Sequence, residues 1–524
     1  MDLLPSAHVD TFARDHLPPD HLWPVIEAPG YPERINAATE LLRAPAGLDR
    51  PALRTADGET WTYADLRRRA GQIAHMLVDD YGLVPGNRVL LRAPNTPWNA
   101  AAWLGVLKAG GIVVTTMAAI RARELAPIIA KTRPQVALVD PRFVDDVVAA
   151  APGLPVVTSF PEGKPETFDD VRTSSDDVAL LCPTSGSTGV PKITMHFHRD
   201  ILAIDDTFGR HYLKLTPDDV VACSAPFAFT FGLGMLMVFP LRAGACSLLT
   251  ETVTPVQLAD LVEREGVTVL ATAPTAYKQI LKAGQAKQLA GLRAGVSAGE
   301  HIPEGVWTRL RDEIGLRVID GIGSTELLHI FISAAGDDIR PGATGKPVPG
   351  YRATILGPDD EEAGPGVEGR LAVIGPVGCR YLDDERQKAY VVNGWNVTGD
   401  TFLRDEDGYF HYRSRTDNMI VSSGYNIGGP EVEAALDDHP DVVEAAVVAR
   451  PDSERGAVVC AFVVLKDGVD RNPAKVAELQ DFVKHQLAPY KYPRDVRFID
   501  VLPRNSSGKL QHFMLRRIVE GTLH

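Results

Sequence analysis

Residues 88–139 have the sequence RVLLRAPNTPWNAAAWLGVLKAGGIVVTTMAAIRARELAPIIAKTRPQVALV, in which short apolar runs alternate with longer helical segments. The apolar runs predict strands at 88–92, 112–116 and 135–139, and the segments between them predict helices at 97–109 and 123–131. Two glycines at 110 and 111 mark the end of the first helix. Strands that alternate with helices in this way form parallel βαβ units. The stretch therefore predicts an α/β fold built on a doubly wound, mostly parallel sheet.

The pattern changes near residue 414. Beyond it we predict a helix from 430, strands at 442–449 and 457–465, a helix after 472 and a short strand at 497–501. A module of about 110 residues is of ordinary domain size. We therefore predict a large N-terminal domain with mostly parallel doubly wound sheets over residues 1–414, and a small α+β domain over residues 415–524.

Composition excludes several classes of protein. The chain has 524 residues, of which 54 are Lys or Arg and 68 are Asp or Glu, so its formal net charge is −14. No dense basic tract is present, which argues against a nucleic-acid partner. The five cysteines are far apart and form no CxxC pair, so neither a disulfide framework nor a zinc site is predicted. The first residues lack the basic start and apolar core of a signal peptide, and we expect a reducing, cytoplasmic location.

Residues 220–241 carry no charge and are long enough to span a bilayer. Pro226, Gly232, Gly234 and Pro240 interrupt the stretch, and a backbone in lipid must satisfy all its own hydrogen bonds. We therefore predict a buried strand–loop–helix and no membrane insertion, with a membrane helix as the alternative.

The segment TSGSTGVPK at 184–192 directly follows the apolar run 178–182. Its glycines let backbone N–H groups turn toward an anion, while its hydroxyls and lysine add donors and positive charge. A triphosphate requires this chemistry. The alternative is a Ser/Gly-rich surface turn, and the loop lacks the Gly-Lys-Ser/Thr ending of a Walker A sequence.

The loop resembles the phosphate loop of the adenylate-forming (ANL) superfamily, which includes acyl-CoA synthetases, adenylation domains and beetle luciferases. Four more segments resemble motifs of that family and follow its order: GIGSTE at 321–326, TGD at 398–400, YRSRTD at 412–417 and PRNSSGK at 503–509. The resemblance implies an enzyme that joins a carboxylic acid to AMP from ATP and then passes the acyl group to a thiol.

The resemblance implies a role for each matching residue. Thr325 would bind the α-phosphate, Glu326 and Thr188 would hold Mg²⁺, and Lys509 would be the mobile catalytic lysine. Asp400 would bind the ribose hydroxyls. The nucleotide would contact Thr184, Ser185, Gly186, Ser187, Thr188, Gly189, Lys192, Gly299, Glu300, Gly321, Ile322, Gly323, Asp400 and Arg415.

The resemblance also implies that the small domain is mobile and turns between two half-reactions. Asp417 would be the hinge, and the turn would carry Lys509 away from the reacting atoms. The arm of coenzyme A would then pass Ser423, Gly424 and Tyr425. A glycine at 424 has no side chain to obstruct that arm.

The segments that face the acid resemble those of benzoate- and 2-aminobenzoate (anthranilate)-CoA ligases. FAFTFGLG at 227–234 places aromatic side chains where the family builds its acyl pocket, and LHIF at 328–331 is similar to a segment of benzoate-type ligases. Residues 10–19 resemble the 2-aminobenzoate branch. The predicted pocket residues are Phe229, Thr230, Phe231, Ala298, Gly323, Leu328, His329 and Ile330. The alternative for the aromatic cluster is simple core packing.

We therefore expect an AMP-forming aryl-CoA ligase that uses ATP, Mg²⁺ and coenzyme A, with 2-aminobenzoate or benzoate as the small aromatic acid. The alternatives are an enzyme that loads a separate carrier protein and a catalytically silent acyl-adenylate-binding protein. His196 and His198 are assigned to packing or substrate-proximal roles rather than to a metal, because no third ligand is identifiable. A homodimer is compatible with the sequence.

Overall fold

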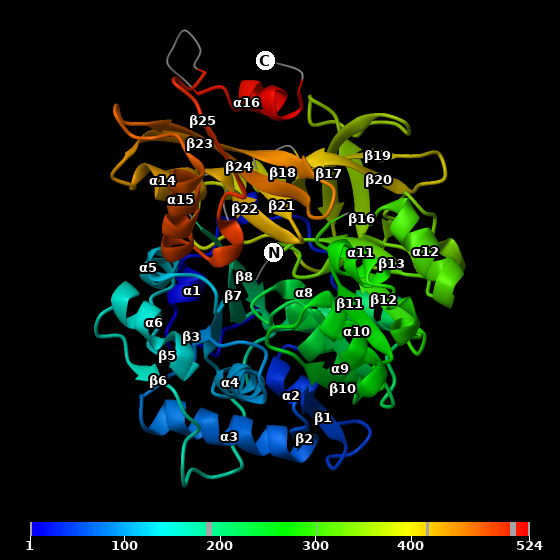
Figure 1. Cartoon of the computed structure of the whole chain (residues 1–524). Coiled ribbons are helices and arrows are strands. Elements are labelled where there is room, and N and C mark those ends of the chain that lie inside the picture. Colours follow the sequence, from blue (N-terminus) through cyan, green and yellow to red (C-terminus); the bar gives the residue numbers. More distant parts are fainter. Residues whose placement is uncertain (1–2, 185–190, 301, 416–418, 504–509, 522–524) are drawn as a thin grey trace.

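The computed structural model describes residues 3–184, 191–300, 302–415, 419–503 and 510–521, with only the backbone at 414–415. The strands form four sheets, two of them largely parallel and two largely antiparallel (Figure 1). In Figure 1 the C-terminal part, residues 419–521, is coloured yellow-orange to red and lies above most of the N-terminal part, beside its yellow-green strands. The predicted α/β fold, with a large N-terminal part and a small α+β C-terminal part, is confirmed.

The first sheet has the strand order β6-β5-β3-β4-β7-β8. Its strands are β3 (Arg88–Arg92), β4 (Ile112–Thr116), β5 (Val136–Val139), β6 (Val156–Val157), β7 (Val178–Thr184) and β8 (Lys192–Phe197). All neighbours are parallel except β7 and β8, which pair antiparallel. The sheet therefore contains the βαβ units that the opening stretch predicts.

The second sheet has nine strands in the order β15-β14-β13-β12-β11-β9-β10-β1-β2. They are β1 (Pro51–Thr55), β2 (Thr60–Thr62), β9 (Val220–Cys223), β10 (Cys246–Leu249), β11 (Val269–Thr272), β12 (Ala294–Ser297), β13 (Ile319–Gly323), β14 (Ile330–Ser333) and β15 (Lys346–Pro347). Strands β1 and β9 to β13 are parallel. Their carboxyl ends lie at one edge, which is where ligands bind in open α/β sheets.

A buried helix lies between these two sheets. All residues of α4 (Pro97–Lys108) except Trp98 are buried, and α4 packs against β1 of one sheet and against β3 and β4 of the other. A helix that is apolar on all sides is stable only when it is covered on all sides. The side chain of Thr96 caps its first turn by accepting a hydrogen bond from the Asn99 N–H.

The other helices of the N-terminal part either pack in the core between the two parallel sheets or cover the outer faces of the sheets. They are α1 (Phe12–Asp15), α2 (Ala37–Leu41), α3 (Tyr63–Asp79), α5 (Ala122–Thr132), α6 (Val144–Ala150), α7 (His198–Ile204), α8 (Thr230–Leu233), α9 (Phe239–Ala243), α10 (Pro255–Arg264), α11 (Pro274–Lys282), α12 (Glu304–Ile314) and α13 (Gln387–Tyr390). Residues 220–241 form a buried strand, a loop and helical turns, as predicted. Among the described residues, no helix combines the length and apolar character needed to cross a membrane.

The third sheet is antiparallel and contains β16 (Arg352–Leu356), β17 (Glu368–Ile374), β18 (Val391–Val392), β19 (Trp395–Arg404) and β20 (Phe410–Arg415). The fourth contains β21 (Met419–Ser422), β22 (Tyr425–Gly428), β23 (Val442–Asp452), β24 (Gly456–Leu465) and β25 (Asp495–Phe498). Helices α14 (Gly429–Asp437) and α15 (Pro473–Gln486) pack on one face of the fourth sheet, and α16 (His512–Val519) packs on the other. The predicted boundary at 414/415 falls at the end of β20, and the predicted hinge Asp417 lies outside the described residues, so both stay predictions.

The histidine pair at 196 and 198 is buried, and its two rings meet different partners. His196 Nε2 forms a hydrogen bond with Thr194 Oγ1 (3.0 Å), whereas His198 Nδ1 accepts one from the Ala37 N–H (3.1 Å). Neither ring belongs to a group of three metal-ligating side chains within the described part of the chain. This arrangement supports the packing role.

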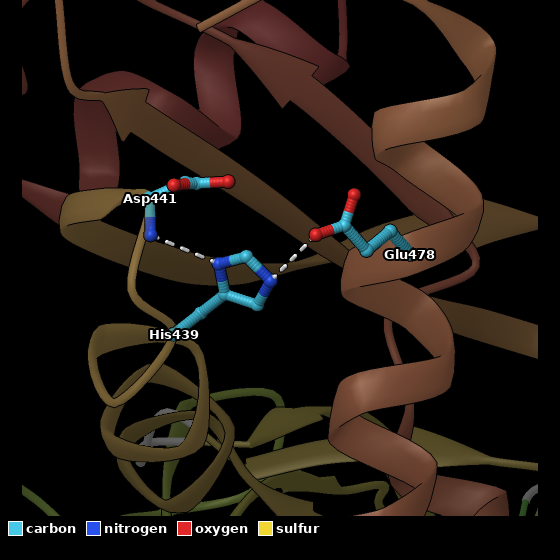
Figure 2. Close-up of side chains that lie close together, drawn as sticks. All are labelled: His439, Asp441 and Glu478. Carbon is cyan, nitrogen blue, oxygen red and sulfur yellow. Dashed lines mark hydrogen bonds and ion pairs between the residues drawn. The ribbon is translucent and has the colours of Figure 1, made fainter.

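In the described residues, one group does bring three metal-ligating side chains together: His439, Asp441 and Glu478 (Figure 2). His439 Nδ1 accepts a hydrogen bond from the Asp441 N–H (3.1 Å), and His439 Nε2 lies 3.2 Å from Glu478 Oε1. The ammonium of Lys475 lies 2.7 Å from both Asp441 Oδ2 and Glu478 Oε2. Because a lysine already forms ion pairs with both carboxylates, we assign this group to an ion cluster inside the C-terminal part.

Candidate active site

A cavity of about 790 Å³ lies where the carboxyl ends of the parallel strands meet the C-terminal part. The end of β7, the start of β8 and the loops after β9, β11, β12 and β13 supply its walls, and the β21–β22 turn at residues 423–424 reaches into it. The predicted site residues in its wall are Thr184, Lys192, Phe229, Thr230, Phe231, Ala298, Gly299, Gly323, Thr325, Glu326, His329, Ile330, Asp400, Ser423, Gly424 and Tyr425. One cavity therefore unites segments that are up to 241 residues apart in the sequence.

Other predicted residues are not in this wall. Glu300, Gly321, Ile322 and Leu328 lie beside it, in the elements that carry its lining residues. Ser185, Gly186, Ser187, Thr188, Gly189, Asp417 and Lys509 lie outside the described residues, as does the side chain of Arg415. Their roles stay predictions.

Glu326 is a buried carboxylate at the end of a chain of polar contacts. Its Oε1 accepts a hydrogen bond from the Tyr381 hydroxyl (2.5 Å) and lies 3.4 Å from Lys192 Nζ. Lys192 also donates to the Tyr381 hydroxyl (2.8 Å). Burial alone would raise the pKa of Glu326, but Lys192 and Tyr381 bring it below the ordinary value of a glutamate. Glu326 is therefore ionised at neutral pH.

Two tyrosines that the motifs do not contain complete this corner. The Lys192 ammonium lies 4.8 Å from the ring centre of Tyr381 and 5.8 Å from that of Tyr390, and both rings line the cavity. Aromatic faces attract cations, so the two rings help to hold Lys192 in place. Each tyrosine lies between two motifs, and the sequence around it has no pattern that indicates a role at the site.

The residues at this corner fit a magnesium ion by their chemistry. Glu326 offers an ionised carboxylate, and Thr184 and Thr325, which also line the cavity, offer hydroxyl oxygens. Mg²⁺ prefers oxygen ligands and is commonly bound by one or two carboxylates together with substrate phosphates.

Two of the predicted nucleotide-binding residues lie on adjacent strands. Asp400 in β19 is the direct antiparallel partner of Arg415 in β20. The Asp400 side chain is buried and lines the cavity. The register of this hairpin therefore brings the backbones of two separate motifs side by side.

The β21–β22 turn is docked against the wall of the cavity. The Gly424 N–H donates to Glu300 Oε1 (2.6 Å), and Thr275 Oγ1 donates to Glu300 Oε2 (2.8 Å). Burial raises the pKa of Glu300, and these two hydrogen bonds oppose the shift. A Cβ atom added to Gly299 would lie 3.2 Å from Gly424 Cα, so the two glycines allow the backbones to touch.

The described residues on either side of segment 504–509, which contains Lys509, lie on the far side of the fourth sheet from the cavity. Leu502 and Leu510, on either side of it, pack with Val448 and Phe462 on the sheet face that α16 covers. The cavity borders the opposite face, where α14 packs. In this arrangement the β21–β22 turn, rather than the flanks of residue 509, lies at the cavity.

Aromatic side chains surround one end of the cavity. Phe229 and Phe231 line it, and Tyr425 of the β21–β22 hairpin meets Phe229 edge-on, with ring centres 5.8 Å apart. Phe227 is buried in the core instead. The aromatic segment thus serves both of the expected purposes, a pocket wall and core packing.

His329 lies in this aromatic wall and is 2% exposed. Its ring centre lies 4.7 Å from that of Phe239 and 5.8 Å from that of Phe231, and neither ring nitrogen makes a hydrogen bond of good geometry with the described residues. Burial lowers its pKa to about 3, against a smaller opposing effect of the Phe231 backbone. The cavity therefore presents a neutral imidazole.

The N-terminal run at 10–19 lies away from the cavity. Asp10 forms an ion pair with Arg88 of β3, and the ring of Phe12 lies 4.4 Å from the same guanidinium. This gives the run a role in covering the first sheet.

Three buried histidines predict a marked sensitivity to acid. Burial lowers the pKa to about 4 for His196 and to about 3 for His198 and His329, from 6.5. The unfolded chain binds protons at these sites near pH 6.5 and the folded chain does not, so stability is present above that pH and is lost as pH falls toward about 4. Each histidine should cost about 2 kcal/mol between pH 6.5 and 5.

The measurement is the free energy of urea unfolding at pH 7.5 and 5.0 for the wild type and His198→Gln. Between pH 7.5 and 5.0 the wild type should lose about 2 kcal/mol more free energy of unfolding than His198→Gln does. His485→Gln is the matched control, because His485 is exposed. An equal pH dependence in wild type and His198→Gln would contradict the prediction.

Two protein families match most of the chain. Residues 43–381 match the family of AMP-binding enzymes, and residues 431–509 match the AMP-binding enzyme C-terminal domain. The benzoate–CoA ligase of Thauera aromatica is 35% identical over 515 residues, which cover 93% of this chain and 96% of that protein.

Two solved structures are also similar. The anthranilate CoA ligase AuaEII in complex with anthranoyl-AMP has a TM-score of 0.72 at 30% identity and covers 93% of this chain and 98% of its own. The amide bond synthetase McbA from Marinactinospora thermotolerans has a TM-score of 0.81 at 26% identity and covers 92% of this chain and 99% of its own. The chain thus belongs to the AMP-binding enzymes of the adenylate-forming superfamily, among the AMP-forming acid–thiol ligases of the aryl-CoA ligase branch.

Proposed function

We propose that this enzyme activates benzoate or 2-aminobenzoate with ATP and transfers the acyl group to coenzyme A. The observation that carries the proposal is a single cavity with three parts: the ionised Glu326, the aromatic wall around His329 and the docked β21–β22 turn. The first part suits a nucleotide with its metal, the second a planar apolar ring, and the third an arm that ends in a thiol.

In the first half-reaction the carboxylate of the acid attacks the α-phosphorus of ATP and expels pyrophosphate. Both reactants are anionic, so positive charge must offset their repulsion as they meet. Lys192 supplies one cation at the cavity wall, and we assign Lys509 to bridge the carboxylate and the α-phosphate. A magnesium ion held by Glu326 and Thr188 would supply further positive charge against the phosphates. The product is an acyl-adenylate.

In the second half-reaction a thiolate attacks the acyl carbon, and AMP leaves with the bonding electrons. We propose that Ser423, Gly424 and Tyr425 flank the arm of coenzyme A on its way to the aromatic wall. Hydrogen bonding of the Gly424 N–H to Glu300 supports this, because it holds the turn at the cavity wall through a residue that has no side chain of its own. We assign the change between half-reactions to a rotation near Asp417.

Within the aromatic wall, His329 favours an acid with one polar ring substituent. A buried imidazole without a good hydrogen bond gains free energy when a ligand supplies a partner. An amino group at position 2 of the ring would supply that partner, whereas benzoate would not. The similarity to an anthranilate CoA ligase supports the same choice.

A substrate panel tests the proposal. AMP release is measured with ATP, magnesium and coenzyme A on benzoate, 2-aminobenzoate, salicylate, acetate and octanoate. We expect kcat/KM to be at least about tenfold higher for the aromatic acids than for acetate and octanoate, because only a planar ring fills an aromatic pocket. Turnover restricted to acetate or octanoate would refute the aryl assignment and leave the adenylation chemistry intact.

The acceptor is tested separately, because the similarity to McbA supports a second candidate, an amine in place of coenzyme A. Acyl transfer from 2-aminobenzoyl-adenylate is measured with coenzyme A, with a simple amine and with a holo-carrier protein. We expect transfer to coenzyme A to be the fastest. If transfer to the amine or to the carrier is faster, that acceptor takes the place of coenzyme A in the proposed reaction.

A further inference from the structure

Lys491 joins the two parts of the molecule through a buried group of charges. Its Nζ lies 2.6 Å from Glu124 Oε1 and 2.7 Å from Glu431 Oε2. Glu124 belongs to α5 of the N-terminal part. Glu431, in α14, and Lys491 both belong to the C-terminal part. The Ala488 N–H also donates to Glu124 Oε2 (2.7 Å), so this one carboxylate receives two contacts from the C-terminal part.

The group is buried, which makes it costly to break. The side chains of Lys491, Glu124 and Glu431 are 6%, 9% and 14% exposed. Burial would lower the pKa of Lys491, but Tyr490 and the two carboxylates raise it above its ordinary value, so the ammonium stays charged. Removal of one partner from a buried ion pair leaves an uncompensated charge.

Other ion pairs that cross between the two parts in the described residues are more exposed. Arg123 pairs with Asp438 at 34% and 58% exposure, and Lys282 pairs with Glu454 at 71% and 62%. Exposed pairs contribute little to stability. Among the described residues, the pair of Lys491 with Glu124 is therefore the most buried ion pair that crosses between these parts.

The charged group lies in the wall of the cavity, beside the β21–β22 hairpin. Tyr490, next to Lys491, stacks on Tyr425 with ring centres 4.3 Å apart. Glu431 uses its second oxygen, Oε1, to accept a hydrogen bond from the Gly428 N–H at the end of β22 (3.1 Å). A continuous series of contacts therefore runs from α5 through Lys491 to the hairpin at the cavity.

We propose that Lys491 is a positioning residue for thioester formation, which fastens the β21–β22 hairpin at the acyl cavity through Glu124. This inference rests on the proposed function, in which the C-terminal part turns between half-reactions. Glu431 travels with Lys491 in such a turn, but Glu124 does not, so the contact with Glu124 is made in the arrangement that brings residues 423–425 to the cavity. Lys491 acts through the hairpin and is not one of the residues that we assign to the reacting atoms.

The test measures the two half-reactions of Lys491→Met separately. ATP–pyrophosphate exchange reports adenylation, and single-turnover transfer from a preformed acyl-adenylate to coenzyme A reports thioester formation. We expect thioester formation to slow by about tenfold and exchange to change by less than threefold. Lys491→Arg, which keeps the cation, should recover most of the transfer rate.

The chain offers a matched control in Lys475, which also joins two carboxylates, at 2.7 Å each, but wholly inside the C-terminal part. Figure 2 shows these two carboxylates, Asp441 and Glu478. Lys475→Met should leave both half-reactions within threefold of wild type. The double variant Glu124→Gln/Lys491→Met should be no slower in transfer than Lys491→Met alone, because both changes break the same contact.

Three outcomes would overturn the inference. Equal loss of both half-reactions in Lys491→Met would indicate a general structural defect, and unchanged transfer would show that the contact does not position the hairpin. Additive effects in the double variant would show that Glu124 and Lys491 act independently. Failure of the proposed function has a different signature, since the wild type itself would then form no thioester with coenzyme A.

Discussion

Glu326→Gln is expected to lower the rate of ATP–pyrophosphate exchange by about 100-fold. The substitution keeps the size of the side chain and an oxygen that can accept the Tyr381 hydrogen bond, but it removes the negative charge. The Glu326 carboxyl group is ionised in the folded protein and lies 3.4 Å from Lys192 Nζ. We assign this carboxylate to hold the metal. The loss should therefore fall on the chemical step that involves the phosphates.

Exchange is measured over a range of magnesium concentrations. Glu326→Gln should need more magnesium for half-maximal activity, and Glu326→Asp, which keeps the charge on a shorter side chain, should recover part of the rate. Tyr381→Phe removes only the hydroxyl that donates to Glu326 and should cost less than about tenfold. Exchange by Glu326→Gln at more than a third of the wild-type rate would refute the assigned role.

The fold could be predicted where local pattern decides it. Strands β3 and β4 have the predicted bounds because their apolar runs end at clear breaks, and α4 was recognisable from Pro97 and the glycines that follow it. The antiparallel pairing of β8 was not predicted. Only seven residues separate β7 from β8, which is too short for a crossover, so β8 must return beside β7 in the opposite direction.

The site could be predicted where a motif supplies several neighbouring residues. Thr325, Glu326 and Asp400 were found in this way, and the structure places all three at one cavity. Tyr381 and Lys491 were missed because each contributes a single side chain from a segment without a motif. Their importance comes from partners far away in the sequence, Glu326 for one and Glu124 for the other, and such pairing is visible only after folding.

Adjacent residues of the predicted pocket lie in different environments. His329 and Ile330 line the cavity, whereas Leu328 packs in the core and has a φ angle of +67°. A positive φ is uncommon for leucine and marks a turn, which redirects the chain between residues 328 and 329. A sequence segment does not reveal such a turn, so the prediction treated the three residues alike.

Gly424→Ala is expected to slow transfer from a preformed acyl-adenylate to coenzyme A by about 10- to 100-fold, with exchange changed by less than threefold. Gly424 has a φ angle of +80°, where a residue with a side chain is strained by about 1–3 kcal/mol. Its added Cβ would also lie 3.2 Å from the Cβ of Ala273 in the cavity wall. Both effects oppose the docked hairpin and narrow the path that we assign to the thiol.

Gly468→Ala is the matched control for this change, because it separates the effect of backbone strain from the effect of a side chain at the cavity. Gly468 lies in the same C-terminal part at a φ angle of +83°, but nothing lies within 4 Å of its added Cβ. It therefore carries the same backbone cost without touching the cavity, and it should lower thermal stability while leaving transfer near the wild-type rate. If Gly424→Ala slows transfer no more than Gly468→Ala does, backbone strain alone explains the loss, and the β21–β22 turn does not border the path of the thiol.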